Sequence, residues 1–224
     1  QSCEIVHAAI DAETCCGEVR YGPFSGMKMR ECSHPYYLLG TYELELHPII
    51  DRINAIQSFE VIINVGACDG YYAVGLALSH PNSRVVAFES RELARPAISD
   101  LALSNGVDGR VSVTGACDIE SIAEAIKLGC LVFMDCEGEE KELLDPITIP
   151  ALKSCYVLVE LHEFAHQGIT EEIRSRFAPS HAIQEIKCRY CVLNDLPFRP
   201  SPDLFTEELQ RFWEPVTPGA PADD

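Results

Sequence analysis

The sequence predicts an α/β fold of the doubly wound, Rossmann-like kind, with a mostly parallel sheet covered by helices on both faces. Strand-like and helix-like segments alternate through the middle of the chain, which is typical of βαβ units. The first strand-like segment, "EVIINVG" (60–66), is a continuous apolar run that ends in glycine, as expected of a strand buried on both faces. We also expect a terminal antiparallel hairpin and an irregular N-terminal cap.

The predicted elements follow one another with short connections. Strands are expected at residues 60–66, 83–89, 110–115, 130–135 and 154–161. Helices are expected at residues 71–80, 91–106, 118–129, 139–144 and 170–178. Asp118 is a favoured helix N-cap, and Gly106 and Gly129 are favoured residues at which a helix ends. The hairpin is expected over residues 182–195.

These elements divide the chain into three parts. Residues 1–55 are expected to form the N-terminal cap, with a helix over residues 45–56. Residues 56–213 are expected to form the Rossmann-like domain. The last segment, 214–224, is rich in proline and acidic residues, which predicts a disordered tail.

Charge and composition restrict the partners of the chain. Hydrophobic residues make up 47% of the 224 residues, enough for a sizeable core. The chain has 17 Lys and Arg against 35 Asp and Glu, and the formal net charge of −18 repels phosphate backbones. No apolar run approaches the roughly 18 residues that a membrane helix needs. We therefore expect a small-molecule substrate, and neither nucleic acid nor a membrane as partner.

The cysteines and the first residues predict a cytoplasmic protein. The eleven cysteines are scattered, and several, such as Cys130 and Cys155, lie in apolar runs where a free thiol behaves as a small buried hydrophobe. Cys188 and Cys191 form C-x-x-C, but no second pair completes a four-cysteine zinc site. The first residues carry acids and no basic region, unlike a secretory signal.

Glycines and polar residues follow successive predicted strands. Parallel sheets of this kind bind ligands at the carboxyl ends of their strands, so these residues are the candidate site. The residues are Asn64, Gly66, Ala67, Asp69 and Gly70 after the first strand, Glu89 after the second, Cys117 and Asp118 after the third, Asp135 and Glu137 after the fourth, and Glu160 and His162 after the fifth. An acid about twenty residues past a glycine turn suits the hydroxyls of a ribose.

The glycine turn favours S-adenosylmethionine over a dinucleotide. A dinucleotide needs G-x-G-x-x-G to admit its pyrophosphate, whereas Gly66 is followed by Ala67, Cys68 and Asp69. Asp69 would repel a phosphate. The sulfonium and ammonium groups of S-adenosylmethionine are cationic, so Asp69 and Asp135 would attract them.

Three segments resemble class I S-adenosylmethionine-dependent methyltransferases. "INVGACDGYYAVGLA" (63–77) looks like their first motif. "LVFMDCEGEEKELL" (131–144) and "YVLVELHEF" (156–164) resemble the D-x-E-G-x-E and E-x-H segments of the FkbM-type branch. The resemblance extends from about residue 21 to about residue 195 and implies a methyltransferase.

The resemblance also implies roles for residues. The methionine part of the cofactor would be surrounded by Gly66, Ala67, Asp69, Gly70 and Tyr71. The other expected contacts are Glu89 with Ser90 at the ribose, Cys117 with Asp118 at the adenine, and Asp135 near the sulfonium. Independently of the resemblance, our hypothesis is that Tyr42 and Glu43, in the cap, close over the cofactor.

Four residues are candidates to orient or deprotonate the acceptor, which we expect to be a small molecule methylated on oxygen. They are Asp135, Glu137, Glu160 and His162. His162 is either the general base or a structural residue that holds a neighbouring loop. The same cluster could hold a divalent ion, but no metal ligand is predicted.

The segment "HEFAH" (162–166) matches the H-E-x-x-H motif of zinc-dependent proteases. A zinc-protease site needs both histidines on one face of a helix and a third ligand, for which Glu185 is the nearest candidate. The preceding residues "YVLV" favour a strand instead, which would place Glu160 and His162 on one side of it. A metal-dependent hydrolase and a non-catalytic cofactor-binding module remain as alternatives.

Overall fold

The computed structural model describes residues 17–30, 33, 35–56 and 59–188. The chain forms two compact units, residues 51–185 and residues 1–50 together with 186–224. The larger unit contains the sheet. The division falls within helix α3 (His47–Asn54), and each unit is described by itself.

The larger unit is built on a sheet of five parallel strands, which confirms the predicted α/β fold. The strands are β1 (Val61–Val65), β2 (Arg84–Phe88), β3 (Val111–Thr114), β4 (Leu131–Met134) and β5 (Tyr156–Val159). Their order is β3-β2-β1-β4-β5, so the strand order reverses between β1 and β4. In this arrangement the crevice beyond the carboxyl ends of β1 and β4 is the expected ligand site.

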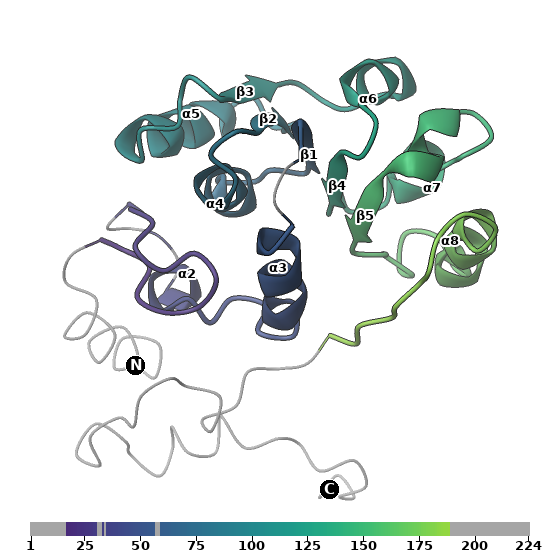
Figure 1. Cartoon of the computed structure of the whole chain (residues 1–224), viewed down its shortest axis with the longest axis horizontal. Coiled ribbons are helices and arrows are strands. Elements are labelled where there is room, and N and C mark those ends of the chain that lie inside the picture. The colour runs from purple at the N-terminus through teal and green to yellow at the C-terminus, as the bar shows by residue number, and fades with distance from the viewer. Residues whose placement is uncertain (1–16, 31–32, 34, 57–58, 189–224) are drawn as a thin grey trace, which may run out of the picture. The chain divides into compact units, whose positions relative to one another are not determined.

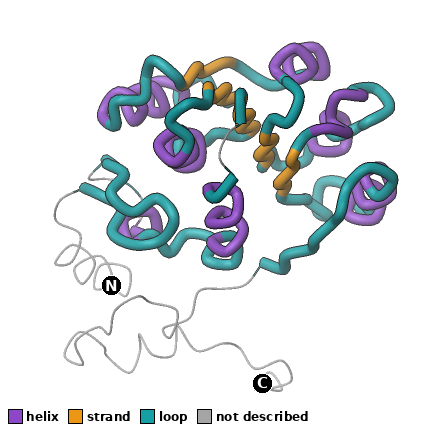
Figure 2. Tube along the Cα trace, viewed as in Figure 1, coloured by secondary structure: helices purple, strands orange, loops and turns teal. Residues whose placement is uncertain are grey.

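Helices cover both faces of the sheet, as Figures 1 and 2 show. Helices α4 (Tyr71–Ser79) and α5 (Arg95–Ser104) lie on one side. On the other side lie α6 (Ile119–Ala125), α7 (Glu140–Leu143) and α8 (Ile169–Phe177). Successive side chains of β1 point to opposite faces of the sheet. Val61, Ile63 and Val65 pack in the core formed with α6, α7 and α8.

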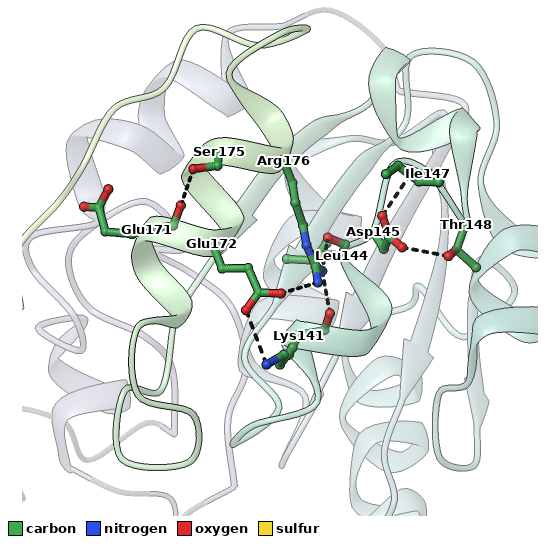
Figure 3. Close-up of polar contacts among 9 residues, drawn as sticks. All are labelled: Lys141, Leu144, Asp145, Ile147, Thr148, Glu171, Glu172, Ser175 and Arg176. Carbon is green, nitrogen blue, oxygen red and sulfur yellow. Dashed lines mark hydrogen bonds and ion pairs between the residues drawn. The ribbon is translucent and has the colours of Figure 1, made fainter.

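Helices α7 and α8 are joined by the side chain of Arg176, which Figure 3 shows between them. The guanidinium donates to the carbonyl oxygens of Lys141 and Leu144, at 2.5 Å and 3.0 Å, at the end of α7. It also pairs with Glu172, which contacts Lys141 at 3.3 Å. Because the last carbonyls of a helix have no partner within the helix, Arg176 satisfies them and fixes the short α7 in place.

Several boundaries differ from those predicted. Helix α5 begins at Arg95 rather than 91, because Pro96 fits only the first turn of a helix. Helix α6 ends at Ala125, since Ile126 is extended and packs into the core, and Gly129 lies in the turn before β4. The capping role of Asp118 is confirmed. The short helices α2 (Pro35–Leu39) and η1 (Pro150–Ser154) were not predicted.

The predicted hairpin over residues 182–195 does not appear in the part that the structure describes. Residues 182–188 form no strand, and residues 189–195 lie outside the described residues. Side chains rather than a backbone ladder hold this segment. Gln184 accepts a hydrogen bond from Arg52 at 2.7 Å, and Glu185 pairs with Arg174 at 2.7 Å.

The smaller unit contains α2 and a short antiparallel pairing between Glu18 and Lys28. Turns fill residues 42–46, so the helix predicted over residues 45–56 begins at His47. The Nε2 atom of His47 lies 3.1 Å from the carbonyl oxygen of Tyr42 and ties this turn to the helix. Within the described residues, no helix is both long and apolar enough to cross a membrane.

The glycine after β1 generates a first prediction. A Cβ atom at Gly66, which has a φ of +79°, would lie 1.6 Å from the backbone carbonyl oxygen of Asp135. Gly129, with a φ of +70°, has nothing within 4 Å of such an atom. In both alanine variants the left-handed backbone lowers the free energy of unfolding by about 1–2 kcal/mol. Gly66→Ala should lose a further ~2 kcal/mol or more because the clash is with backbone.

Urea denaturation of the two variants measures this difference directly. Gly129→Ala is the matched control because it shares the backbone conformation and lacks the collision. Equal losses of unfolding free energy in the two variants would show that the close approach of β1 and β4 is not needed for folding.

Candidate functional site

The turn between β1 and α4 presents its backbone at the carboxyl end of the sheet. The N–H groups of Gly66 and Ala67 both donate to the carbonyl oxygen of Phe88, at 3.0 Å and 2.9 Å. Cys68 and Gly70 have positive φ angles of 52° and 95°. The N-cap residue of helix α4 is Gly70, which has no side chain to cap the helix. The structure thus forms a tight turn at the place predicted from sequence, directly after the carboxyl end of β1.

Glu89 lies directly beside this turn. Its side chain is buried, and its Oε2 atom accepts a hydrogen bond from the backbone N–H of Cys68 at 2.7 Å. Its Oε1 atom accepts from the backbone and side chain of Arg91, each at 2.9 Å. Because each carboxylate oxygen accepts about two hydrogen bonds, Glu89 keeps capacity for a ligand hydroxyl.

Arg91 keeps Glu89 ionised despite its burial. Burial alone would raise the pKa of Glu89, but the hydrogen bonds from Arg91 and from the Cys68 amide hold this pKa below its ordinary value. The guanidinium also lies 3.3 Å from the sulfur of Cys68. Arg95 braces the same loop by donating to the backbone carbonyls of Glu89 and Ser90, at 2.8 Å and 3.0 Å. Ser90 itself is exposed.

Two predicted residues after β3 have structural contacts. The Oδ1 atom of Asp118 accepts from the Ser121 N–H at 2.8 Å and caps α6. Burial raises the pKa of the Cys117 thiol to about 12, so this thiol stays protonated. Their contact with the adenine stays a prediction.

Asp135 follows β4 at the point where the strand order reverses. Its backbone N–H donates to the carbonyl oxygen of Val65 at 3.0 Å, next to Gly66. Burial and the repulsion of Glu160, reinforced by Glu137 and Glu140, raise the pKa of Asp135 to about 6, while His162 acts in the opposite direction. Its Oδ1 atom is buried and makes no hydrogen bond to any described residue. This carboxylate is therefore costly to keep charged.

His162 is held by a residue that the sequence did not single out. The Nδ1 atom of His162 lies 2.8 Å from the Oε1 atom of Glu140, whose side chain is fully buried in α7. Burial opposes a charge on His162, but Glu140 and then Asp135 raise the pKa of the imidazole above its ordinary value. Glu140 shares a helix face with Leu143 and Leu144, and this spacing is the signal that identifies it as buried.

The other ring nitrogen of His162 faces two acids. Its Nε2 atom lies 3.6 Å from Asp135 Oδ1 and 3.6 Å from Glu137 Oε2. Glu137 is largely exposed and has a left-handed backbone with a φ of 61°, which is uncommon outside glycine. Glu160 is exposed at the end of β5, and its N–H donates to Met134 at 2.9 Å. The structure thus brings together the four residues predicted to act on the acceptor.

The "HEFAH" segment does not form a zinc-protease site. Its residues lie in a turn after β5, and His166 is exposed. Among the described residues, His166 belongs to no group of side chains close enough to share a metal ion. Both oxygens of Glu163 accept N–H groups at the start of α8, at 2.7 Å and 2.9 Å, so Glu163 caps that helix. Glu185, the proposed third ligand, pairs with Arg174.

The remaining predicted residues have different surroundings. Asn64 is buried within β1, and its Oδ1 atom makes no hydrogen bond to a described residue. Tyr71 is buried at the start of α4. Tyr42 and Glu43 belong to the smaller unit, so their closing over the cofactor stays a prediction.

Comparison with known proteins gives only distant similarities, and the three solved structures given below are described as methyltransferases. No protein-family model matches the sequence, and no curated protein matches it. The precorrin-6y C5,15-methyltransferase of Geobacter metallireducens has a TM-score of 0.45 and 14% identity over 58% of this chain and 71% of its own. The O-methyltransferase TomG of Streptomyces achromogenes, solved with S-adenosylmethionine, has a TM-score of 0.43 and 18% identity over 60% of this chain and 65% of its own.

A third example is the O-methyltransferase of Bacillus cereus in complex with S-adenosylhomocysteine. Its TM-score is 0.40, with 17% identity over 70% of this chain and 64% of its own. The match therefore spans just under two thirds of TomG and of this enzyme. All three similarities are distant in sequence and in structure.

The raised pKa of Asp135 generates a second prediction. A carboxyl group whose pKa rises on folding binds its proton more tightly in the folded state, so the protein loses stability as the pH rises from about 4 to about 6. Asp135→Asn should be neutral near pH 4. Near pH 8 it should raise the free energy of unfolding by about 1–2 kcal/mol, a value discounted because a third of the side chain is exposed.

Urea denaturation in buffer with a chelator, at both pH values, tests this expectation. Asp108→Asn is the control. It removes the same charge from an exposed residue that lies outside the acidic group around Asp135. A loss of stability in Asp135→Asn near pH 8, or the same gain in both variants, would contradict the account of the cluster.

Proposed function

We propose that the protein is an S-adenosylmethionine-dependent methyltransferase that acts on an oxygen of a small-molecule acceptor. The proposal rests on the contact between the glycine turn and Asp135 at the switch point of the sheet, where the strand order reverses between β1 and β4. Gly66 lies against the Asp135 carbonyl, and Glu89 is tied to the Cys68 amide of the same turn. Ligands of doubly wound sheets bind at this point.

The charges at the switch point favour a cationic cofactor without phosphate. Asp135 is surrounded by Glu137, Glu140 and Glu160, which repel its negative charge. A sulfonium or ammonium group placed there would relieve the repulsion, whereas a pyrophosphate would add to it. The ionised Glu89 is suited to accept a hydrogen bond from a ribose hydroxyl at Oε2, which accepts only the Cys68 amide.

The reaction transfers a methyl group from sulfur to oxygen. The sulfur–carbon bond of the sulfonium breaks as the oxygen–carbon bond forms, which leaves S-adenosylhomocysteine, and the acceptor hydroxyl gives up its proton. The protein contributes mainly by holding donor and acceptor in line. Asp135, Glu137, Glu160 and His162 are the groups proposed to bind the acceptor oxygen and assist the loss of its proton.

Sequence motifs, net charge and side-chain contacts make the proposed function more specific. Residues 131–144 and 156–164 resemble the FkbM-type branch, which supports assignment to that branch. The formal net charge of −18 favours a small acceptor over a nucleic acid. The alternative of a hydrolase built on "HEFAH" loses its support, since Glu163 and Glu185 are used in other contacts.

Calorimetric titration with S-adenosylmethionine and S-adenosylhomocysteine tests the proposal. We expect binding in the micromolar range. Glu89→Gln should weaken the affinity about tenfold or more, because a hydrogen bond to a charged group contributes about 1.5–3 kcal/mol. The control is Glu92→Gln, an exposed acid three residues further on that should leave the affinity unchanged.

Three results would be informative. The absence of binding to either compound would overturn the proposed function. An equal effect of Glu89→Gln and Glu92→Gln would place the cofactor elsewhere. Tight binding without methyl transfer to any of a panel of hydroxylated compounds would favour the non-catalytic binding module.

A further inference from the structure

We propose that Asp135, Glu137 and His162 form a binding site for a divalent transition-metal ion, oriented by Glu140. One ligand atom from each of the three residues lies within 4.8 Å of the other two. Two carboxylates and one imidazole are a donor set suited to ions from Mn²⁺ to Zn²⁺, whereas Mg²⁺ and Ca²⁺ prefer oxygen ligands alone. The ion site itself does not depend on the proposed function.

The orientation of His162 is the first argument for this site. The ring is about nine-tenths buried, and Glu140 fixes it through Nδ1 at 2.8 Å. The Nε2 atom therefore points toward Asp135 and Glu137, and it makes no hydrogen bond within 3.5 Å to a described residue. Histidines that bind metals usually donate the other ring N–H to a carboxylate, a backbone carbonyl or water, which sets the tautomer and the ring angle.

The buried oxygen of Asp135 is the second argument. Its Oδ1 atom is shielded from solvent and lacks a hydrogen bond, which is costly for a carboxylate oxygen. This atom faces His162 Nε2 at 3.6 Å. A cation between the two would satisfy both atoms at once. Nothing else in the described part of the chain offers Oδ1 a closer donor.

The distances allow an ion with small adjustments. Ligand atoms about 2.0–2.2 Å from one metal ion lie roughly 3–3.5 Å apart, so the 3.6 Å separations are close to the required spacing. Glu137 is 75% exposed, so its side chain can move toward the ion. Three protein ligands leave positions open for other oxygens.

The open positions suggest how the ion would serve the acceptor, an extension that rests on the proposed function. A hydroxyl oxygen bound to a divalent ion loses its proton more readily, which makes it a better nucleophile for the methyl group. His162 would then be a ligand rather than the general base. The acceptor class is a hydroxylated compound able to bind a metal ion through oxygen.

Mn²⁺ binding to the full chain, followed by electron paramagnetic resonance without added cofactor, tests the site. We expect one tightly bound ion with an electron spin-echo modulation from the imidazole nitrogen. His162→Gln should remove the nitrogen signal, and it and Glu137→Gln should each weaken binding more than tenfold. Glu140→Gln removes no ligand and should weaken binding about 10–100-fold while keeping the nitrogen signal.

The control is Glu139→Gln, which removes the same charge from an exposed residue of the same loop. It should leave Mn²⁺ binding unchanged. Thermal unfolding of each variant shows whether the fold is retained. The proposal is overturned if no Mn²⁺ or Zn²⁺ binds, or if His162→Gln, Glu137→Gln and Glu139→Gln behave alike, because the ion would then be held by the general negative charge of the surface. Failure here leaves cofactor binding untouched, so the two proposals fall separately.

Discussion

The close approach of Gly66 to the backbone carbonyl of Asp135 is the contact on which the site depends. Only a hydrogen atom fits between them, since a Cβ atom would lie 1.6 Å from that oxygen. This contact lets β1 and β4 stay paired to their carboxyl ends, where the chain must turn in opposite directions to build the two halves of the sheet. The glycine turn and the acidic loop therefore start from one point. Every function proposed for this end of the sheet requires that juxtaposition.

Three buried or partly buried acids lie near the carboxyl ends of the strands, and they differ in how their charge is compensated. Glu89 is compensated by Arg91 and the Cys68 amide, and Glu140 by His162, so these two buried carboxylates are structural neighbours of the site. Asp135 accepts no hydrogen bond at its buried Oδ1 atom, and burial and the acids around it raise its pKa although His162 acts in the opposite direction. A residue that costs stability where it stands is typical of a functional site. The missing partner is a positive charge, which a cationic cofactor or a metal ion would supply.

Much of the fold and part of the site followed from the sequence. Continuous apolar strands such as residues 60–66 identify a parallel sheet, and the carboxyl ends of its strands place Glu89, Asp135 and His162 near one edge. Glu140 was missed because it stands among Glu139 and Glu142 in a short acidic helix, and its helical spacing to Leu143 and Leu144 was the signal that sets it apart. Arg91 was missed for a similar reason, because a contact of a long side chain depends on the path of its loop.

Amide chemical-shift mapping during titration with S-adenosylhomocysteine tests the central claim most directly. The account predicts that the affected amides cluster in residues 66–71, 89–91 and 135–137, at the carboxyl ends of β1, β2 and β4. Shifts confined to the opposite ends of the strands, around residues 106–110 and 127–130, would contradict it. So would a titration that leaves every amide unchanged.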